Sequence, residues 1–596
     1  MRYFLNLFIL LLLSDNFSAQ VTFSKIPKQL QLFPRDENNF GHFEVEGKST
    51  VPATIRTVVS EVASGKLTET FSLQISPDKV FVINHKIQAC LKEYNLEVFI
   101  TDTSLVEQRV EFIRNLVAGD FFIVAGQSNA NCMLTAGYQK HDSVFQNSFI
   151  RAIGGDFSWA TALSGDSVHA NVDLEVDFSF GRPSSLSNFS NDVAYSGIWP
   201  MSLQSELTNK TGIPNCVANG SRGAVGIPAH YASHTPSIPD SLQFSNGPKN
   251  IPPALLYDRM YKKLFINNAT AGVKGIFWYQ GESDGAVPYD SAIHYGRRFR
   301  KLYNSWKADY PSLKKIFVMQ INLGCGGDHL SIVREIERKL PEEYNDVVVM
   351  STVGSPLSDR YTDGCHYTVE GYTRIATKLL PLAEKYLYDF PLDEKLILPA
   401  NVQKIYYSAT NEICIEFDKD IIAQDSCFYA GPIRGTAYLK DYFYMQDGLK
   451  IKLNSLRSEN NKVFLNLFAD ESFVKKITYL PGIFTDIPSI YGGPWILNKD
   501  NEELGAYSFF EFPVQQFDPK EKIMVYPNPA KNYLKINFKE NEQGKIYIYN
   551  LYGDVLLTSD IESGQMILNT SALNSGIYLL VIRGYSTIFT SKLVIE

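Results

Sequence analysis

Alternating apolar and polar positions dominate the first part of the chain, residues 20–117. Leu96, Val98 and Ile100 show the pattern, in which every second side chain is apolar. Such alternation is typical of strands with one buried face, and the runs here are separated by polar turns. The pattern predicts a small antiparallel β-sandwich over residues 20–117.

Between residues 118 and 390 the pattern changes to short apolar runs separated by amphipathic stretches. The runs predict buried strands at residues 121–125, 213–218, 275–279, 315–321 and 347–351. The stretches between them repeat apolar residues at helical spacing, namely Leu203/Leu207, Phe299/Leu302/Tyr303/Trp306, Ile332/Ile336/Leu340 and the run 369–386. Alternating strands and helices predict a parallel sheet with helices on both faces.

Strand-like patterns return after residue 390. Residues 391–514 contain candidate strands at 463–465 and 477–479, and we expect an accessory β domain there. A polar, charged linker at 515–522 precedes a further β module over 523–596. The chain is thus predicted to be multidomain, with a central α/β domain flanked by β domains.

A long polar insertion, residues 133–195, follows the first strand of the central domain. Irregular insertions of this length usually have a functional role, so we expect this one to shape a substrate site.

The first 19 residues have the features of a secretory signal peptide. Arg2 precedes an apolar core at 4–13, and small residues at Ser18 and Ala19 offer a cleavage site. The apolar core is too short to cross a bilayer, and no later stretch predicts a transmembrane helix. We therefore expect an exported protein, with an uncleaved N-terminal anchor as the alternative.

The length of the chain indicates several domains, and its net charge argues against a nucleic-acid partner. A chain of 596 residues requires several hydrophobic cores. Its net charge is −8 and no basic stripe occurs, so nucleic acid is not an expected partner.

The seven cysteines do not have zinc-site spacing, and an odd number leaves at least one unpaired within the chain. Cys414 with Cys427, or Cys325 with Cys365, could pair in an oxidising compartment. Buried thiols are an equally valid interpretation.

The stretch 119–132, GDFFIVAGQSNANC, contains the first candidate for catalysis. Ligands of open α/β sheets bind beyond the carboxyl ends of the strands, and Ser128 lies just after such an end. Its hydroxyl would be exposed, and its N–H would be one of the unpaired donors at a helix start, able to face an oxyanion. The alternative is that Ser128 only caps the helix.

Two more strand ends carry polar groups. Gly220, in the segment NCVANGS, would let the backbone present its N–H to a ligand. In WYQGESD, Gln280 offers an amide donor, and Glu282 is expected to be a buried brace or, less favourably, a second acid.

The segment DGCH supplies a candidate base. Asp363 and His366 are three residues apart at the start of an amphipathic run, so their side chains can share one face. His366 could then direct one ring nitrogen at Ser128 and the other at Asp363, which would orient the imidazole. The pair Asp328–His329 is a weaker candidate, because adjacent side chains diverge.

Taken together, GQSN at Ser128, WYQGESD at Gln280 and DGCH at His366 resemble the SGNH hydrolase superfamily, in its sialate O-acetylesterase and carbohydrate acetylesterase branch. The resemblance covers residues 118–390 and implies a flavodoxin-like α/β/α domain. One position departs from the family pattern, because relatives usually have Gly-Gly-Thr or Gly-Gly-Ser where this chain has Asn-Gly-Ser around Gly220.

The same resemblance implies roles for individual residues and needs no metal or cofactor. Ser128 is the nucleophile, His366 the general base and acid, and Asp363 its partner. The implied oxyanion donors are the N–H groups of Ser128 and Gly220 and the Gln280 amide. Two further residues are possible supports of the site, namely Asn129 and Glu282.

The last module resembles the C-terminal sorting domain of the type IX secretion system of Bacteroidetes. The matching motifs are YPNPA at 526–530, LYG at 551–553 and SGIYLL at 575–580. This resemblance implies export through the periplasm and outer membrane by the type IX machinery, to the cell surface or the medium. The alternative is an ordinary terminal β-sandwich.

The resulting hypothesis is a secreted serine esterase that removes O-acetyl groups from sialic acids through an acetyl-Ser128 intermediate. An acetylesterase acting on another polysaccharide such as xylan is a close alternative, because substrate choice lies in the insertion and the flanking β domains. A non-catalytic glycan-binding surface protein is the competing class.

Overall fold

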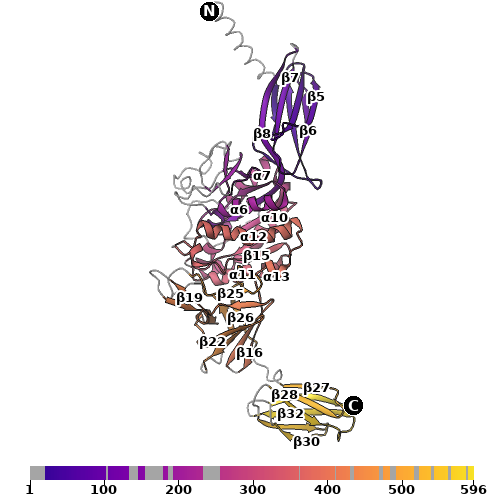
Figure 1. Cartoon of the computed structure of the whole chain (residues 1–596), viewed down its shortest axis with the longest axis vertical. Coiled ribbons are helices and arrows are strands. Elements are labelled where there is room, and N and C mark those ends of the chain that lie inside the picture. The colour runs from indigo at the N-terminus through magenta and orange to yellow at the C-terminus, as the bar shows by residue number, and fades with distance from the viewer. Residues whose placement is uncertain are drawn as a thin grey trace, which may run out of the picture. The chain divides into compact units, whose positions relative to one another are not determined.

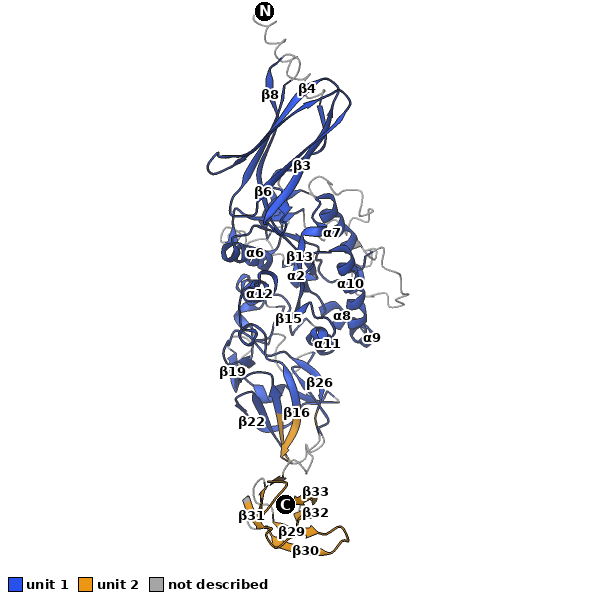
Figure 2. Cartoon of the chain, turned by 90° about the vertical axis from the view of Figure 1, so that its right-hand side faces the viewer, with its two compact units in different colours: residues 1–404, 415–513 blue, residues 405–414, 514–596 orange. Residues whose placement is uncertain are grey.

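The computed structural model describes most of the chain and divides it into two compact units. The described residues are 21–101, 105–132, 145–154, 179–185, 192–232, 255–286, 288–325, 327–361, 363–409, 411–429, 435–446, 448–468, 474–482, 491–515, 523–538, 543–561, 565–584 and 588–596. One unit comprises residues 1–404 and 415–513, and the other comprises residues 405–414 and 514–596 (Figure 2). The predicted signal peptide, most of the 133–195 insertion and most of the 515–522 linker lie outside the described residues.

The N-terminal strands form the predicted antiparallel sandwich. One sheet has the order β1(Val21–Lys25), β3(Phe40–Ser49), β6(Val80–Gln88). The other pairs β5(Leu67–Ile75), β4(Ala53–Glu61), β7(Tyr94–Thr101) and β8(Glu107–Gly126). Side chains that alternate along these strands, among them Val45, Ile55 and Leu96, are fully buried in one core. The period-two pattern therefore identified the inner face of β7, where Leu96, Val98 and Ile100 are buried. It is wrong for β5, where the alternating Phe71 and Leu73 are exposed.

The central sheet contains all five predicted buried strands. They are β8, β12(Asn215–Asn219), β13(Val273–Tyr279), β14(Lys315–Gln320) and β15(Val347–Ser351), all parallel to their neighbours in the order β12-β8-β13-β14-β15. The sheet continues through β9(Ile150–Ile153), β10(Phe180–Ser184) and β11(Val193–Tyr195).

The predicted all-parallel sheet is wrong at that edge, because β10 pairs antiparallel with β9. These short strands come from the insertion region and extend the edge of the sheet, where a reversed strand disturbs no inner parallel pairing.

Strand β8 belongs to two sheets. Its 20 residues pair with β7 over the first half, up to Leu116, and with β12 and β13 from Asp120 onward. The short β2(Leu32–Pro34) pairs with β8 between these two regions. The predicted boundary between residues 117 and 118 therefore falls inside one continuous strand.

Helices lie on both sides of the central sheet (Figures 1 and 2). Helices α6(Ile198–Thr211) and α12(Val369–Tyr388) pack together on one side, and α7(Leu255–Ile266), α10(Tyr295–Asp309) and α11(Leu330–Glu343) lie on the other. The predicted helical faces of α6, α10, α11 and α12 contribute buried residues to the core. Shorter elements are α2(Ser128–Asn131), η1(Ile227–His230), η2(Thr270–Gly272), α8(Glu282–Ala286), α9(Tyr289–Ile293), η3(Leu357–Asp359) and α13(Glu394–Ile397).

The region after α13 is β-rich, as predicted. Its strands are β16(Val402–Ala409), β17(Glu412–Phe417), β18(Ile421–Ala423), β19(Ser426–Tyr429), β20(Gly435–Tyr438), β21(Phe443–Met445), β22(Leu453–Glu459), β23(Lys462–Leu467), β24(Lys476–Tyr479), β25(Ile496–Asn498) and β26(Phe509–Pro513), with η4(Leu439–Tyr442). The candidate strands at 463–465 and 477–479 correspond to β23 and β24.

The last module contains two antiparallel sheets around a core of its own. One has the order β27(Ile523–Tyr526), β28(Tyr533–Phe538), β31(Gln565–Asn569). The other has the order β30(Val555–Asp560), β29(Gly544–Tyr549), β32(Gly576–Gly584), β33(Ile588–Ile595).

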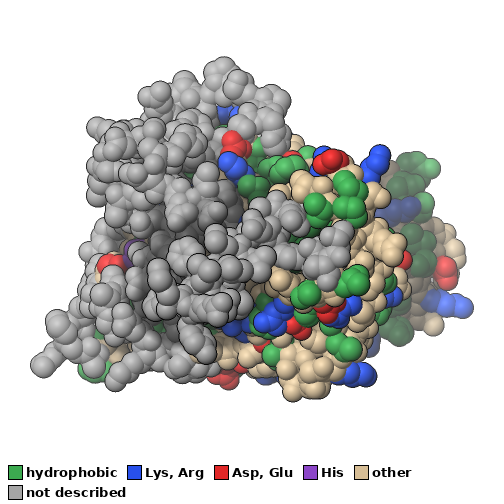
Figure 3. Space-filling model, turned by 90° about the horizontal axis from the view of Figure 1, so that it is seen from above, with side chains coloured by type: hydrophobic (Ala, Val, Ile, Leu, Met, Phe, Trp, Pro, Cys, Tyr) green, Lys and Arg blue, Asp and Glu red, His purple; other side chains and the backbone are tan. Residues whose placement is uncertain are grey.

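No helix among the described residues combines the length and the apolar composition needed to cross a bilayer. On the described part of the face in Figure 3, basic, acidic and hydrophobic side chains are interspersed, without an extended patch of one charge sign.

We predict that Gly119→Ala destabilises the central sheet. A Cβ at Gly119 of β8 would lie 1.8 Å from the Pro214 carbonyl oxygen, so β8 and the start of β12 would have to separate. Overpacking of this kind costs about 1–3 kcal/mol. The expected result is a lower melting temperature by differential scanning calorimetry. Gly435→Ala is the matched control, because no heavy atom lies within 4 Å of its added Cβ. Equal melting temperatures for the two variants would contradict the prediction.

Candidate active site

The chain turns sharply at the carboxyl end of β8. Gly126 has φ +137°, and a Cβ there would lie 2.0 Å from the Tyr279 carbonyl oxygen, so only glycine fits. Gln127 then occupies the N-cap position of α2, and its N–H donates to the same carbonyl at 2.9 Å. The interpretation of Ser128 as an N-cap is therefore wrong, and its hydroxyl is directed elsewhere.

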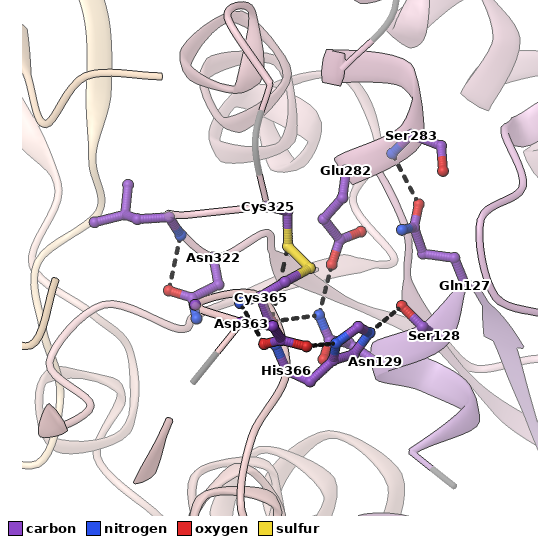
Figure 4. The surroundings of a disulfide bond; sticks show 12 residues. Gln127, Ser128, Asn129, Glu282, Ser283, Asn322, Cys325, Asp363, Cys365 and His366 are labelled. Carbon is purple, nitrogen blue, oxygen red and sulfur yellow. Dashed lines mark hydrogen bonds and ion pairs between the residues drawn. A yellow bond between two sulfur atoms is a disulfide. The ribbon is translucent and has the colours of Figure 1, made fainter. Parts of the chain in front are cut away.

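Ser128, His366 and Asp363 form a hydrogen-bonded file (Figure 4). The Ser128 Oγ lies 2.8 Å from the His366 Nε2, and the His366 Nδ1 lies 2.6 Å from the Asp363 Oδ2. Ser128 lies in α2, and Asp363 and His366 lie in the segment before α12. Ser128 and His366 are 238 positions apart in the sequence. The arrangement can transfer a proton from the hydroxyl to the imidazole while the carboxylate stabilises the resulting imidazolium.

Asp363 is held in its ionised form by local donors. Its Oδ1 accepts the N–H groups of Cys365 at 2.9 Å and of His366 at 3.0 Å. Partial burial opposes ionisation, but the backbone and imidazole donors of His366 and the Cys365 amide outweigh it and lower the pKa of Asp363. The Asp363 carboxylate therefore stays ionised beside His366 as the pH falls, until the pH reaches this lowered pKa.

Asn129, the residue after Ser128, joins three neighbouring segments. Its Nδ2 donates to the Glu282 Oε1 at 2.8 Å and to the Cys365 carbonyl at 3.2 Å, and its Oδ1 accepts from the Tyr372 hydroxyl at 3.2 Å. Its own carbonyl accepts from the Trp199 Nε1 at 3.0 Å. The Asn129 side chain is fully buried, so these bonds tie α2 to the His366 segment without competition from water.

Glu282 is a buried carboxyl group beside this network. Desolvation raises its pKa, although the bond from Asn129 acts in the opposite direction. Its Oε2 has no hydrogen-bond partner among the described residues. The position of the group favours the structural brace over the second acid, because its one bonded oxygen is used to orient Asn129.

Two of the three predicted oxyanion donors, the Gly220 N–H and the Gln280 amide, donate to other groups in the structure. The Gly220 N–H donates to the Val124 carbonyl at 2.8 Å, so Gly220 is not an oxyanion donor in this structure, contrary to the prediction. A Cβ at Gly220 would lie 2.3 Å from the Met260 Cε, so a larger residue would require the flexible end of Met260 to shift.

Gln280 is also engaged elsewhere. Its Nε2 donates to the Asp284 Oδ2 at 2.6 Å and to the Val225 carbonyl at 3.2 Å. Asp284 is fully buried and pairs with Arg298 at 2.8 Å, so it requires such donors. The predicted oxyanion role of Gln280 is therefore not met in this structure. The N–H of Ser128 remains a candidate, because it makes no hydrogen bond to another described residue.

The weaker base candidate, His329, forms no hydrogen bond with Ser128 in the described part of the chain. The His329 ring packs edge-on against Tyr289, with 5.6 Å between ring centroids. No group of three His, Cys, Asp or Glu side chains among the described residues is arranged to hold a metal ion. The absence of a cofactor stays a prediction.

Sequence reasoning missed several supporting residues. Asp284 lies in the WYQGESD motif but received no role, and Arg298, Tyr372 and Trp199 had no motif to identify them. Of the two cysteine pairings left open, Cys325–Cys365 is the disulfide in the structure, and Cys427 retains a free thiol.

Comparison with known families agrees with both resemblances. Residues 241–387 match the family described as "Carbohydrate esterase, sialic acid-specific acetylesterase", and residues 524–596 match "Secretion system C-terminal sorting domain". The first match includes Gln280, Glu282, Asp363 and His366 but begins after Ser128. The second indicates export by type IX secretion, to the cell surface or the medium.

Two individual proteins extend the comparison. A probable carbohydrate esterase of Arabidopsis thaliana is 32% identical over 136 residues, which are 23% of this chain and 48% of that protein. The match therefore spans about half of the length of that relative. The crystal structure of a carbohydrate acetylesterase from Xanthomonas citri shares the fold, with a TM-score of 0.54 and 17% identity over 82% of this chain and 99% of the other.

We predict that Glu282→Gln preserves the site and Glu282→Ala does not. A glutamine keeps an acceptor oxygen for Asn129, whereas alanine leaves the buried Asn129 amide short of a partner, at about 1–3 kcal/mol. Melting temperature and kcat for an acetyl ester should be near wild type for the first variant and reduced for the second. Equal losses in both variants would show instead that the negative charge of Glu282 is required.

Proposed function

We propose that this protein is a secreted serine carbohydrate esterase that removes O-acetyl groups from sialic acids through an acetyl-Ser128 intermediate. The observation that carries the proposal is the file of hydroxyl, imidazole and carboxylate, with 2.8 Å and 2.6 Å between successive heavy atoms. The proposal includes an SGNH, flavodoxin-like esterase domain over residues 118–390, a supporting β-sandwich over 20–117 and an accessory β domain over 391–514.

The chemistry proceeds in two acyl transfers. His366 accepts the Ser128 proton as the hydroxyl attacks the acetyl carbonyl, and the resulting imidazolium is stabilised by Asp363. The oxyanion forms beside the Ser128 N–H, and one donor of this kind contributes about 3 kcal/mol to the stability of the transition state. His366 then gives the Ser128 proton to the sugar oxygen as the C–O bond of the tetrahedral intermediate breaks, and the sugar leaves as an alcohol. In the second half, His366 activates a water molecule that hydrolyses the acetyl-enzyme.

The substrate class rests on family likeness. The family that matches residues 241–387 is described as sialic acid-specific, which favours O-acetylated sialic acid. An acetylesterase for xylan or another polysaccharide uses the same chemistry and is the second candidate. The hydrogen bonds that join Ser128 to His366 and His366 to Asp363 argue against a purely glycan-binding protein.

We predict that Ser128→Ala abolishes acetate release. The variant lacks the nucleophile, whereas α2 retains the side-chain bonds of Asn129, so the fold should persist. Acetate release should be measured on p-nitrophenyl acetate, on O-acetylated mucin and sialosides, and on acetylated xylan. Preferential turnover of the sialosides supports the proposed substrate, and preferential turnover of xylan supports the second candidate. Equal rates for wild type and variant would remove Ser128 as nucleophile.

We further predict that Asp363→Asn keeps the fold but lowers kcat by roughly 10³- to 10⁴-fold, because a neutral amide stabilises neither the required imidazole tautomer nor the imidazolium. An unchanged melting temperature controls for folding, since the Asp363 side chain is 48% exposed. Near-normal turnover would mean that another carboxylate orients His366.

A further inference from the structure

The segment that carries Asp363 and His366 has little regular structure of its own. It runs from the end of β15 to the start of α12, residues 352–368, and its described part contains only the short η3 and one bridge between Arg360 and Tyr367. His366 therefore owes its position to specific tethers rather than to a helix or strand.

Cys365, the residue next to His366, is fixed through all of its functional groups (Figure 4). Its N–H donates to the Asp363 Oδ1 at 2.9 Å, and its carbonyl accepts from the Asn129 Nδ2 at 3.2 Å. Its Sγ is bonded to Cys325. Two of these tethers are single hydrogen bonds, and the disulfide is the covalent one.

The other end of the disulfide is anchored near the sheet. Cys325 follows β14, an inner strand paired with both β13 and β15. The guanidinium of Arg360 reinforces the same junction, because its Nη2 donates to the carbonyls of Leu323 and Gly364. The disulfide therefore connects the His366 segment to the loop between β14 and α11, 40 residues earlier in the chain.

We propose that the Cys325–Cys365 disulfide is a positioning element for His366, and that the oxidised protein is the active form of the enzyme. The inference rests on the proposed esterase function. On reduction, a dithiol such as dithiothreitol gives two electrons and two protons to the disulfide. It yields thiols at Cys325 and Cys365 and is itself oxidised to a disulfide. Both cysteines are partly exposed, so a small reductant can reach them.

The proposal links the active site to the route of export. Disulfides form in the periplasm and outside the cell but are rare in the cytosol. The type IX sorting module indicates that the chain follows this route. The His366 segment is thus fixed only after the chain leaves the cytosol, so esterase activity arises during export.

The test compares oxidised and dithiothreitol-reduced full-length protein in acetate release from p-nitrophenyl acetate, well below the melting temperature. We expect kcat to fall by about 100-fold, the cost of a misplacement near 1 Å, with a much smaller change in KM. The labelling rate of Ser128 by a fluorophosphonate should fall in parallel, because labelling needs the activated hydroxyl. Reoxidation should restore both.

Two variants make the result specific. Cys325→Ser/Cys365→Ser should have the low kcat of the reduced wild type and no response to dithiothreitol. Cys90→Ser/Cys427→Ser removes the two partly exposed free thiols and should keep the full response. If the first variant cannot be produced folded, the reduced wild type answers the same question.

Full activity of the reduced protein, with both thiols verified by alkylation and mass spectrometry, would overturn the proposal. Loss of near-UV circular dichroism on reduction would also overturn it, because the disulfide would then maintain the fold rather than position one residue. If the oxidised wild type shows no Ser128-dependent activity, the esterase function itself fails.

Discussion

The parallel pairing of β8 with β13 is the constraint on which the site depends. The register places Gly126 opposite Tyr279, so both strands end at the same level, and the two polar loops begin side by side. The missing side chain at Gly126 permits this approach, and the bond from the Gln127 N–H to the Tyr279 carbonyl extends it by one residue. Ser128 at the start of α2 and Glu282 at the start of α8 thereby lie at the same edge of the sheet.

Three buried carboxyl groups lie beside that edge. Desolvation raises the pKa of Glu282, Asp284 and Glu337, and each of them accepts a hydrogen bond from a protein donor. Buried carboxyl groups are costly unless such donors are in place. These donors therefore restrict how the chain around Glu282 and the neighbouring Asn129 can be arranged.

Sequence patterns predicted the strands and the file of Ser128, Asp363 and His366, because short apolar runs and an Asp-x-x-His spacing are local signals. The reversed β10 and the disulfide choice depend on contacts between distant segments. The predicted oxyanion roles of Gly220 and Gln280 are not met for the same reason. The residue type at a strand end indicates what a group can donate. The pairing of β12 with β8 and the buried carboxylate of Asp284 decide where the Gly220 N–H and the Gln280 amide donate.

The continuity of β8 links the two cores of this part of the chain. One strand supplies the sandwich with its first half and the central sheet with its second half, and it ends two residues before Ser128. A truncation that removes every strand of the sandwich must therefore cut inside β8, and it leaves a new chain end in the sheet that positions Ser128. The module after residue 522 has a core of its own, so its removal cuts no strand of that sheet.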